Sequence, residues 1–256
     1  MIDIHAHVLP GLDDGPANMG EALALVRAAA DDHIDTIVAT PHMLDGVYNV
    51  QLEDIFAGVA ELNEALAEHG IPVTVLVGGD VHAEAEVPAL LRDGRLATVA
   101  DRGKYLMLEL PPDVMPQELD QLLFNIELQG VRPVISHPER NRVIQEDPGE
   151  LLSLVQAGSL TQITAASIVG DFGSRVRKCC ESLFEWRLAH FVATDMHGTR
   201  RRKPKLTEAA ERLTELLGEQ EANEILYDNP EALIHGKYVD VPEPATPKPQ
   251  KRWFFW

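Results

Sequence analysis

The sequence predicts an α/β protein, an incomplete or distorted TIM-like barrel of seven βα units, and three observations support this fold class. Seven short segments rich in Val and Ile alternate with amphipathic stretches of helical period, the pattern of parallel strands joined by helical crossovers. Residues able to carry chemistry follow six of the seven segments, whereas an open sheet would gather them at one switch point. A chain of 256 residues with 45% hydrophobic content has the size of one such barrel.

The positions of the expected strands and helices follow from the apolar segments and from the amphipathic stretches. The strands are expected at residues 2–4, 34–39, 73–77, 105–110, 132–136, 160–164 and 190–193. The helices are expected at residues 18–32, 52–69, 116–129, 148–157, 173–187 and 205–217. Asn18 and Pro116 are start signals, and Gly70, Gly130 and Gly158 are stop signals.

Residues 242–256 differ in composition from the barrel that precedes them. Pro242 to Pro249 form a Pro-rich linker, and the chain ends in Lys251-Arg252-Trp253-Phe254-Phe255-Trp256. We therefore divide the chain into a barrel, residues 1–241, and a basic and aromatic C-terminal tail, residues 242–256. Aromatic rings beside cations favour membrane interfaces and partner surfaces, so the tail is expected to contact a partner or a membrane surface.

Composition excludes several classes of partner and location. The formal net charge of −19 repels nucleic acid, so no nucleic-acid partner is expected. The start lacks a basic segment followed by a long apolar one, and no run of about 18 apolar residues occurs, so the body is expected in the cytoplasm. Cys179 and Cys180 are adjacent and poorly placed for a disulfide, so we expect them to pack in a helix in a reducing compartment.

The chain opens with an apolar strand that ends in two histidines, His5 and His7. Because strand residues alternate between faces, both side chains point the same way, as two ligands of one metal must. Further His, Asp and Glu residues follow other expected strands, and the carboxyl ends of barrel strands meet at one mouth. The candidate metal ligands are His5, His7, Asp14, His42, Asp80, Glu109, His137, Asp195 and His197. The scattered His33, His69, His190 and His235 are expected to have packing or surface roles.

Nine nitrogen and oxygen ligands are too many for one ion. Two ions would leave some of them idle, whereas three ions that share carboxylates and keep a few waters would use them all. A mixture of His and carboxylates without Cys favours Mn, Fe or Zn over Ca, and the order of affinities does not choose among the three. The sequence therefore predicts three divalent metal ions.

Seven segments that bear candidate ligands or distinctive motifs follow one another at barrel spacing: residues 5–16, 40–42, 108–111, 137–140, 163–167, 195–198 and 228–233. A lone His-x-His is weak evidence, whereas seven ordered segments at barrel spacing are strong evidence. Together they resemble the polymerase-and-histidinol-phosphatase (PHP) superfamily, and within it the bacterial manganese-dependent protein-tyrosine phosphatases of capsule and exopolysaccharide loci.

The resemblance implies a distorted seven-stranded PHP barrel that holds three metal ions, Mn²⁺ above all, on the nine candidate ligands. It also implies that Arg140 and Arg202 receive the substrate phosphate. The chain departs from the family at the third strand, where Gly78-Gly79-Asp80 replaces the pattern Gly-x-Glu. Because Asp is one methylene shorter than Glu, that metal position would shift, take a water or weaken, with His82 and Glu84 as alternative ligands.

The charge of such a site suits a phosphomonoester. Three divalent ions beside four carboxylates leave a net charge of about +2, to which Arg140 and Arg202 add forks of donors for phosphate oxygens. A water held between the ions, with its pKa lowered to about 7, is the expected nucleophile. A phenolate of pKa about 10 leaves readily, so phosphotyrosine makes little demand on a general acid, for which Asp13 and His42 are the candidates.

The resemblance also implies a phosphotyrosine-bearing protein as substrate, expected to be a membrane-bound tyrosine kinase that controls capsule or exopolysaccharide synthesis. The protein would then work in the cytoplasm, at the inner face of the membrane. Alternatives stay open: a small-molecule PHP phosphatase, such as one acting on histidinol phosphate, a phosphodiesterase, or a metal-bearing regulator of the kinase without turnover. An amidohydrolase would need a modified lysine where Glu109 stands, and the Cys-x5-Arg and P-loop patterns do not occur.

Overall fold

The computed structural model describes residues 1–48 and 50–245, and within them short, largely buried strands alternate with helices. Apolar runs of a few residues bounded by turns are long enough to cross a small barrel. The strands are β1 (Ile2–Ala6), β2 (Thr36–Ala39), β3 (His42–Met43), β4 (Thr74–Val77), β5 (Asp80–His82), β6 (Tyr105–Glu109), β7 (Arg132–Ser136), β8 (Leu160–Thr164) and β9 (Phe191–Ala193).

Every strand pairing among the described residues is parallel, in two sheets with the orders β1-β2-β4 and β3-β5-β6-β7-β8-β9. Two strand passes are split between the sheets: Thr40 and Pro41 separate β2 from β3, and Gly78 and Gly79 separate β4 from β5. Proline cannot donate to a strand ladder, and a Cβ on Gly78 would lie only 2.5 Å from Val38 Cγ1. The described residues therefore make seven strand passes, as the sequence predicts.

The barrel closes between β9 and β1. The Asp195 amide donates a hydrogen bond to the His5 carbonyl over 2.8 Å, and the His7 amide donates to the Met196 carbonyl over 2.9 Å. These bonds join the last strand pass to the first, immediately after β9 ends. The predicted distorted TIM-like barrel is confirmed, and its closure brings the two ends of the predicted ligand set together.

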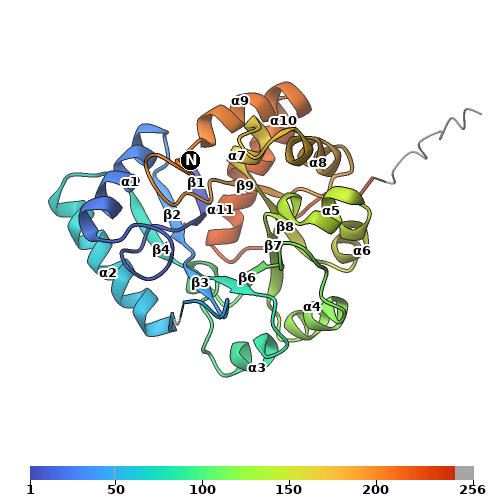
Figure 1. Cartoon of the computed structure of the whole chain (residues 1–256), viewed down its shortest axis with the longest axis horizontal. Coiled ribbons are helices and arrows are strands. Elements are labelled where there is room, and N and C mark those ends of the chain that lie inside the picture. Colours follow the sequence, from blue (N-terminus) through green and yellow to red (C-terminus); the bar gives the residue numbers. More distant parts are fainter. Residues whose placement is uncertain (49, 246–256) are drawn as a thin grey trace, which may run out of the picture.

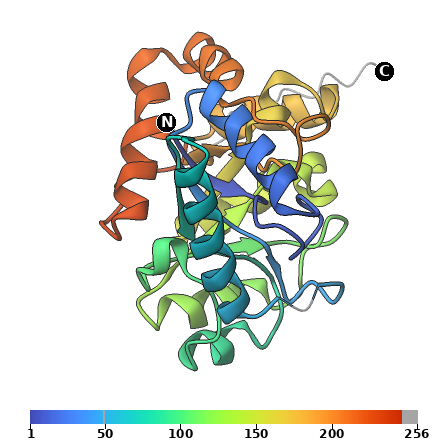
Figure 2. The ribbon, with the colours of Figure 1, turned by 90° about the vertical axis from the view of Figure 1, so that its left-hand side faces the viewer.

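The helices surround the strands (Figure 1; Figure 2). Asn18 caps the first helix by accepting a hydrogen bond from the Glu21 amide over 3.1 Å. Gly70 follows the second with φ of 61°, a left-handed conformation that suits glycine. Six helices match the predicted ones, α4 beginning after the expected Pro116: α1 (Met19–Asp31), α2 (Leu52–Glu68), α4 (Leu119–Glu127), α6 (Glu150–Gln156), α8 (Ser174–Glu185) and α9 (Leu206–Leu217).

Several shorter helical segments were not predicted, because one or two turns are too short for a 3.6-residue period to show. They are α3 (Val87–Arg92), α5 (Arg142–Glu146), α7 (Ala165–Val169), α10 (Glu219–Asn223) and α11 (Asn229–Ile234). Short 3₁₀ turns occur at Val99–Asp101 and Pro138–Arg140, and a π-helical turn occurs at Glu224–Asp228. The turn at Pro138–Arg140 matters for function, because it directs Arg140 toward the mouth of the barrel.

Two clusters of buried apolar side chains form the core. The larger combines strand residues with the surrounding helices, and the smaller combines residues of the strands with Leu233 and Ile234 of α11. Met107, Val134 and Leu160 of the smaller cluster each precede a polar residue by two positions, on the same face of the strand. Those polar residues, Glu109, Ser136 and Gln162, thus stand above an apolar floor at the carboxyl ends of the strands.

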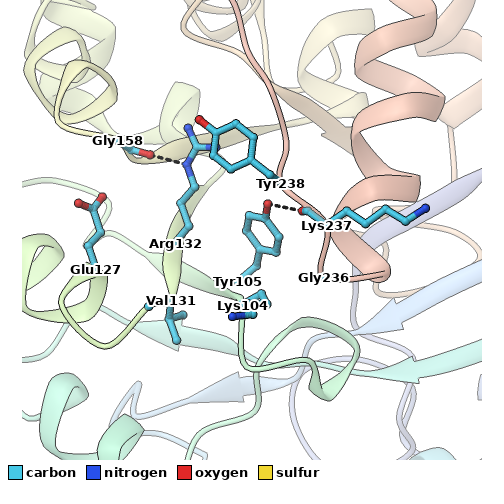
Figure 3. Close-up of a pocket in the computed structure, with 10 residues that line it drawn as sticks. Lys104, Tyr105, Glu127, Val131, Arg132, Gly158, Gly236, Lys237 and Tyr238 are labelled. Carbon is cyan, nitrogen blue, oxygen red and sulfur yellow. Dashed lines mark hydrogen bonds between the residues drawn. The ribbon is translucent and has the colours of Figure 1, made fainter.

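The opposite end of the barrel carries a pocket of about 520 Å³ (Figure 3). The Tyr105 hydroxyl donates to the Lys237 carbonyl over 2.7 Å, and Arg132 Nη1 donates to the Val239 carbonyl over 2.8 Å. The Arg132 guanidinium also lies 5.3 Å from the ring centroid of Tyr238. These contacts fasten the segment after α11 to the amino ends of β6 and β7, an end that serves stability rather than chemistry in such barrels.

The structure tests some of the expectations about the cysteines, membrane-spanning segments and the C-terminal tail. Cys179 and Cys180 are buried in α8 without a disulfide, as predicted, and burial raises the pKa of Cys179 to about 12. Among the described helices, none combines the length and apolar character needed to cross a membrane. The predicted contact of the aromatic tail falls on residues 246–256, outside the described part of the chain.

Candidate metal centre

His5 and His7 point to the same side from the carboxyl end of β1, as strand alternation predicts. Their Nε2 atoms are 3.3 Å apart, and both side chains are buried. His5 Nδ1 lies 2.9 Å from Gln162 Oε1, and His7 Nδ1 lies 2.6 Å from Asp13 Oδ2. Because these oxygens are acceptors, each Nδ1 carries the proton, which leaves both Nε2 lone pairs free for a metal.

All nine predicted ligands meet at the mouth formed by the carboxyl ends of the strands. Seven of them form three overlapping groups whose ligand atoms lie within 4.8 Å of one another: His7, Asp14, His42 and His197; His5, His7 and Asp80; His42, Asp80 and Glu109. The other two border these groups. His137 Nε2 lies 3.7 Å from Asp80 Oδ2, and Asp195 Oδ1 lies 3.6 Å from His5 Nε2.

The atoms that face one another in these groups lack other partners. Asp80 Oδ2, Asp195 Oδ1 and His42 Nδ1 are buried and form no hydrogen bond with any described residue. At metal–ligand distances of about 2.0–2.2 Å, two ligands of one ion lie about 3.0–3.6 Å apart; Asp80 Oδ2 lies 3.5 Å from His5 Nε2. Because unpaired buried carboxylate oxygens are costly, the donor set fits metal ions held among these groups.

Asp80 reaches the centre despite its shorter side chain. The Ser136 hydroxyl donates to its Oδ1 over 2.8 Å, which turns Oδ2 toward His5 and His137. Of the two alternative ligands at this strand, His82 is near the centre, with Nδ1 3.5 Å from Glu109 Oε2, whereas Glu84 is exposed. The geometry therefore favours Asp80 as the ligand from the third strand pass, with His82 beside Glu109.

Asp195 divides its two oxygens between the ligand groups and the predicted phosphate-binding arginines. Oδ1 lies 3.5 Å from His7 Nε2, while Oδ2 accepts from Arg140 Nη2 over 2.8 Å and from Arg202 Nη2. Arg140 comes from the 3₁₀ turn after β7 and Arg202 from the loop after β9. Although burial opposes it, the two guanidinium groups hold the pKa of Asp195 well below its usual range.

Burial and neighbouring charges shift the protonation of the centre in opposite directions. Burial raises the pKa of Asp80 to about 6 and lowers the pKa of His7 to about 3 and of His137 to about 4. Against its own burial, Glu109 and Asp80 raise the pKa of His42 to about 9. Neutral His7 and His137 offer lone pairs to a cation at neutral pH, and the raised pKa of His42 shows that negative charge is concentrated here.

Asp13, a predicted general acid, is committed to other contacts. Besides His7, its Oδ2 accepts from the His42 amide over 3.2 Å, and its Oδ1 accepts from the Gly15 amide over 3.0 Å. Both oxygens are therefore engaged, and the carboxylate fixes His7 and the start of β3. The side chain of His42, the other predicted acid, belongs to two of the three ligand groups. The geometry favours positioning for Asp13 and ligation for His42.

Sequence reasoning missed the residues that support the ligands. Besides Gln162 and Ser136, Asp3 accepts from the Thr194 amide over 2.9 Å and from its hydroxyl, which ties β1 to the end of β9. Glu139 Oε1 accepts from the Thr164 amide and the Ser167 hydroxyl over 3.1 and 2.7 Å, holding the turn that carries Arg140. The available signal was a polar residue inside a wholly buried strand, such as Gln162 in β8.

Two cavities adjoin the centre. The larger, of about 650 Å³, shares Asp14, His197 and Arg202 with it. The smaller, of about 270 Å³, lies on the side of Glu109 and Arg140. Arg202 lines both cavities and Arg140 lines the smaller one, so both predicted phosphate-binding residues border space beside the centre.

A closed parallel barrel with a His- and carboxylate-rich cluster at its mouth defines a class of protein, the metal-dependent barrel hydrolases. Within this class, the chain belongs to the CpsB/CapC family of capsular polysaccharide synthesis, whose model matches residues 1–235. The resemblance seen in the sequence is thereby confirmed at the level of the family.

Two relatives match this chain over nearly its full length. The chain is 36% identical over 256 residues to the tyrosine-protein phosphatase YwqE of Bacillus subtilis (strain 168), with 100% of each chain covered. It is 30% identical over 254 residues to the putative tyrosine-protein phosphatase CapC of Staphylococcus aureus, with 99% of each covered.

Solved structures confirm the fold. One from a set described as YwqE from Bacillus subtilis and CpsB from Streptococcus pneumoniae, unique metal-dependent tyrosine phosphatases, matches with a TM-score of 0.93 at 36% identity, covering 97% of this chain and 100% of that chain. The lactonase Lmo2620 from Listeria monocytogenes matches with a TM-score of 0.61 at 14% identity, covering 93% of this chain and 95% of that one. The second match shows likeness of fold alone.

Proposed function

We propose that this protein is a metal-dependent protein-tyrosine phosphatase. The observation that carries the proposal is the meeting of Arg140 and Arg202 at Asp195, directly beside the three overlapping ligand groups. Two guanidinium forks next to a multinuclear cation site suit a phosphoryl group, whose oxygens accept hydrogen bonds from both. The names of the relatives YwqE and CapC support the same activity.

The cofactor is proposed to be three divalent metal ions, with Mn²⁺ favoured and Fe or Zn as alternatives. Three overlapping groups of ligand atoms support three positions, with His137 and Asp195 completing the set. Imidazole and carboxylate without thiolate suit these metals. When bound, the ions would supply an activated water and positive charge for the phosphoryl oxygens.

The protein's own residues position the phosphate and the ligands. One oxygen of Asp195 holds both Arg140 and Arg202, which would pre-position the two guanidinium groups for the phosphate. Asp13 and Gln162 fix the rings of His7 and His5. A phenolate leaving group of pKa about 10 needs little protonation, so the site can work with Asp13 in a positioning role.

The phosphotyrosine is proposed to belong to a membrane-bound tyrosine kinase of a capsule or exopolysaccharide system, with the phosphatase acting in the cytoplasm at the inner face of the membrane. The family match to capsular polysaccharide synthesis supports this partner. The tail, residues 242–256 beyond the barrel of residues 1–241, is proposed to assist docking. Deleting residues 250–256 should lower co-sedimentation with kinase-bearing membranes and leave peptide hydrolysis intact; unchanged co-sedimentation would reject the docking role.

The activity itself is tested by removing and restoring metal. The protein is stripped with chelator, and phosphate release from a phosphotyrosyl peptide is measured as Mn²⁺ is restored. Turnover should return with Mn²⁺ in the wild type and be lost in His5→Ala and Arg140→Ala. Absence of turnover in wild-type protein that demonstrably binds Mn²⁺ would move the assignment to a small-molecule phosphatase or a regulator without turnover.

A further inference from the structure

The larger cavity beside the metal centre carries positive charge that the proposed chemistry does not use. It is walled by α1 and by the loop after β9. Three of its lining residues belong to the centre, so it opens directly onto the place where the phosphate would bind. Its other charged lining residues are Glu21, Arg200 and Arg201.

Glu21 also lines this cavity, but no ion pair among the described residues joins it to either arginine. Its Oε1 accepts from Asn18 Nδ2 over 3.2 Å and its Oε2 accepts from the Ala17 amide over 3.0 Å, so it completes the cap of α1. Arg200 and Arg201 are exposed, and neither forms an ion pair or a side-chain hydrogen bond with a residue that the structure describes.

Arg200 and Arg201 are distinguished by their position rather than by the lack of an ion pair. The exposed Arg142, Arg175 and Arg212 each form an ion pair. The exposed Arg27, Arg95 and Arg187 form none with a described residue, but they do not line a cavity beside the centre. Two adjacent arginines without such partners make a local positive patch at the mouth of the centre, which attracts negative charge from solution.

The loop that carries the two arginines is held at both ends. The His197 amide donates to the Arg202 carbonyl over 2.9 Å, and Arg202 is bound to Asp195. Further along, Lys205 Nζ lies 2.9 Å from Asp171 Oδ2. Arg200 and Arg201 therefore project from a segment whose position relative to the centre is fixed, as a binding subsite requires.

The smaller cavity on the other side lacks such charge. Apart from residues of the centre itself, it is lined by Leu110, Pro112, Ser136, Pro138 and Asn141. Of the two cavities, as the described residues line them, the one between α1 and the loop after β9 therefore offers a phosphotyrosyl polypeptide positive charge outside the centre.

We infer that the cavity lined by Arg200 and Arg201 receives the polypeptide flank of the substrate and favours acidic residues beside the phosphotyrosine. The inference rests on the proposed function and adds a sequence preference to it. A single exposed ion pair contributes little to binding. Two arginines beside a cationic centre, however, also raise the rate at which an acidic peptide associates. The combined effect on kcat/KM is expected to be about three- to tenfold at low salt.

The test compares two phosphotyrosyl peptides of equal length, one with Glu and one with Gln at the flanking positions, and p-nitrophenyl phosphate, on Mn²⁺-loaded protein. The test variant is the double substitution Arg200→Gln and Arg201→Gln. The matched control is Arg92→Gln with Arg95→Gln, which removes the same charge from exposed residues in and just after α3.

Wild type and control should prefer the Glu peptide by about three- to tenfold, the test variant should lose that preference, and kcat/KM for p-nitrophenyl phosphate should agree within about twofold among all three. Equal hydrolysis of both peptides by the wild type, or a preference that survives in the test variant, overturns the inference and leaves the proposed function standing. Failure of Mn²⁺-loaded wild type to hydrolyse any of the three substrates overturns both.

Discussion

The ring of His7 is fixed by Asp13, whose Oδ2 lies 2.6 Å from His7 Nδ1. The same carboxylate accepts from the amides of His42 and Gly15, so one side chain orients two ligand-bearing segments at once. A carboxylate in this position also raises the basicity of the ring nitrogen that faces the metal. Asp13 is thus better placed to tune a ligand than to give a proton to a leaving group.

Asp13→Asn should weaken Mn²⁺ binding by about 10- to 100-fold, because the amide keeps the shape but loses the charge that supports His7. Titration of apo protein with Mn²⁺, followed by calorimetry, measures the change. Rates on a series of aryl phosphates, at saturating metal, separate the two possible roles. A positioning residue gives a similar loss for every leaving group, whereas a loss that grows with leaving-group pKa would instead identify Asp13 as the general acid.

Metal removal should lower the melting temperature. Asp80 and Asp195 are buried side by side with ring nitrogens, and without cations their unpaired oxygens destabilise the fold. Metal at 100-fold above its dissociation constant stabilises by about 3 kcal/mol, which corresponds to about 5–10 °C for a chain of this size. Calorimetry with and without chelator measures the shift. The melting temperature of His5→Ala should change less on metal removal than that of the wild type. A melting temperature unmoved by chelation would refute a structural role for the ions.

The sequence alone could predict the barrel and the candidate ligands because both correspond to local patterns of residues. Short apolar runs rich in Val and Ile gave the seven strand passes, and His, Asp or Glu at the end of a strand or directly after it gave residues such as Glu109 and His137. The split of one pass into β4 and β5 had no such local pattern. It depends on the approach of Gly78 to Val38, a contact between segments far apart in the chain.

The supporting residues could not be assigned from sequence for a related physical reason. Gln162 is a single polar residue in a buried strand, and its partner, His5, stands at the other end of the barrel order. Only closure of β9 onto β1 makes them neighbours. The same holds for Asp3 and Thr194, which a reading of local period treats as unrelated.

Arg140→Lys should lower kcat by about 10- to 100-fold, because lysine keeps the charge but loses the planar fork. The Arg140 guanidinium contacts Asp195 and also lies 5.4 Å from the ring centroid of Phe172, two contacts that a compact ammonium group does not reproduce together. Phe172→Leu should have a smaller effect, mainly on KM for aryl phosphates. Steady-state rates on p-nitrophenyl phosphate distinguish these outcomes, and an Arg140→Lys variant with wild-type kcat would show that charge alone suffices.

His190, which is not one of the candidate ligands, should make the fold sensitive to acid. It is buried at the start of the last strand pass, where its Nδ1 accepts from the Thr161 amide over 3.0 Å, and burial, aided by Arg132, lowers its pKa to about 3. The unfolded chain binds a proton at this ring below its ordinary pKa of about 6.5, whereas the folded chain does not. The stabilising effect of the neutral ring is therefore complete above that pH and is lost as pH falls toward about 3.

Between about pH 7 and pH 5, this one group should remove about 2 kcal/mol of unfolding free energy. Urea denaturation of wild type and His190→Gln, both in chelator so that metal loss does not contribute, should show a flatter pH dependence for the variant. Because His190→Gln could itself lower stability, the slopes are compared rather than the absolute values. An NMR titration of the wild-type ring gives an independent check: a His190 that protonates near pH 6.5 in the folded protein would contradict the prediction.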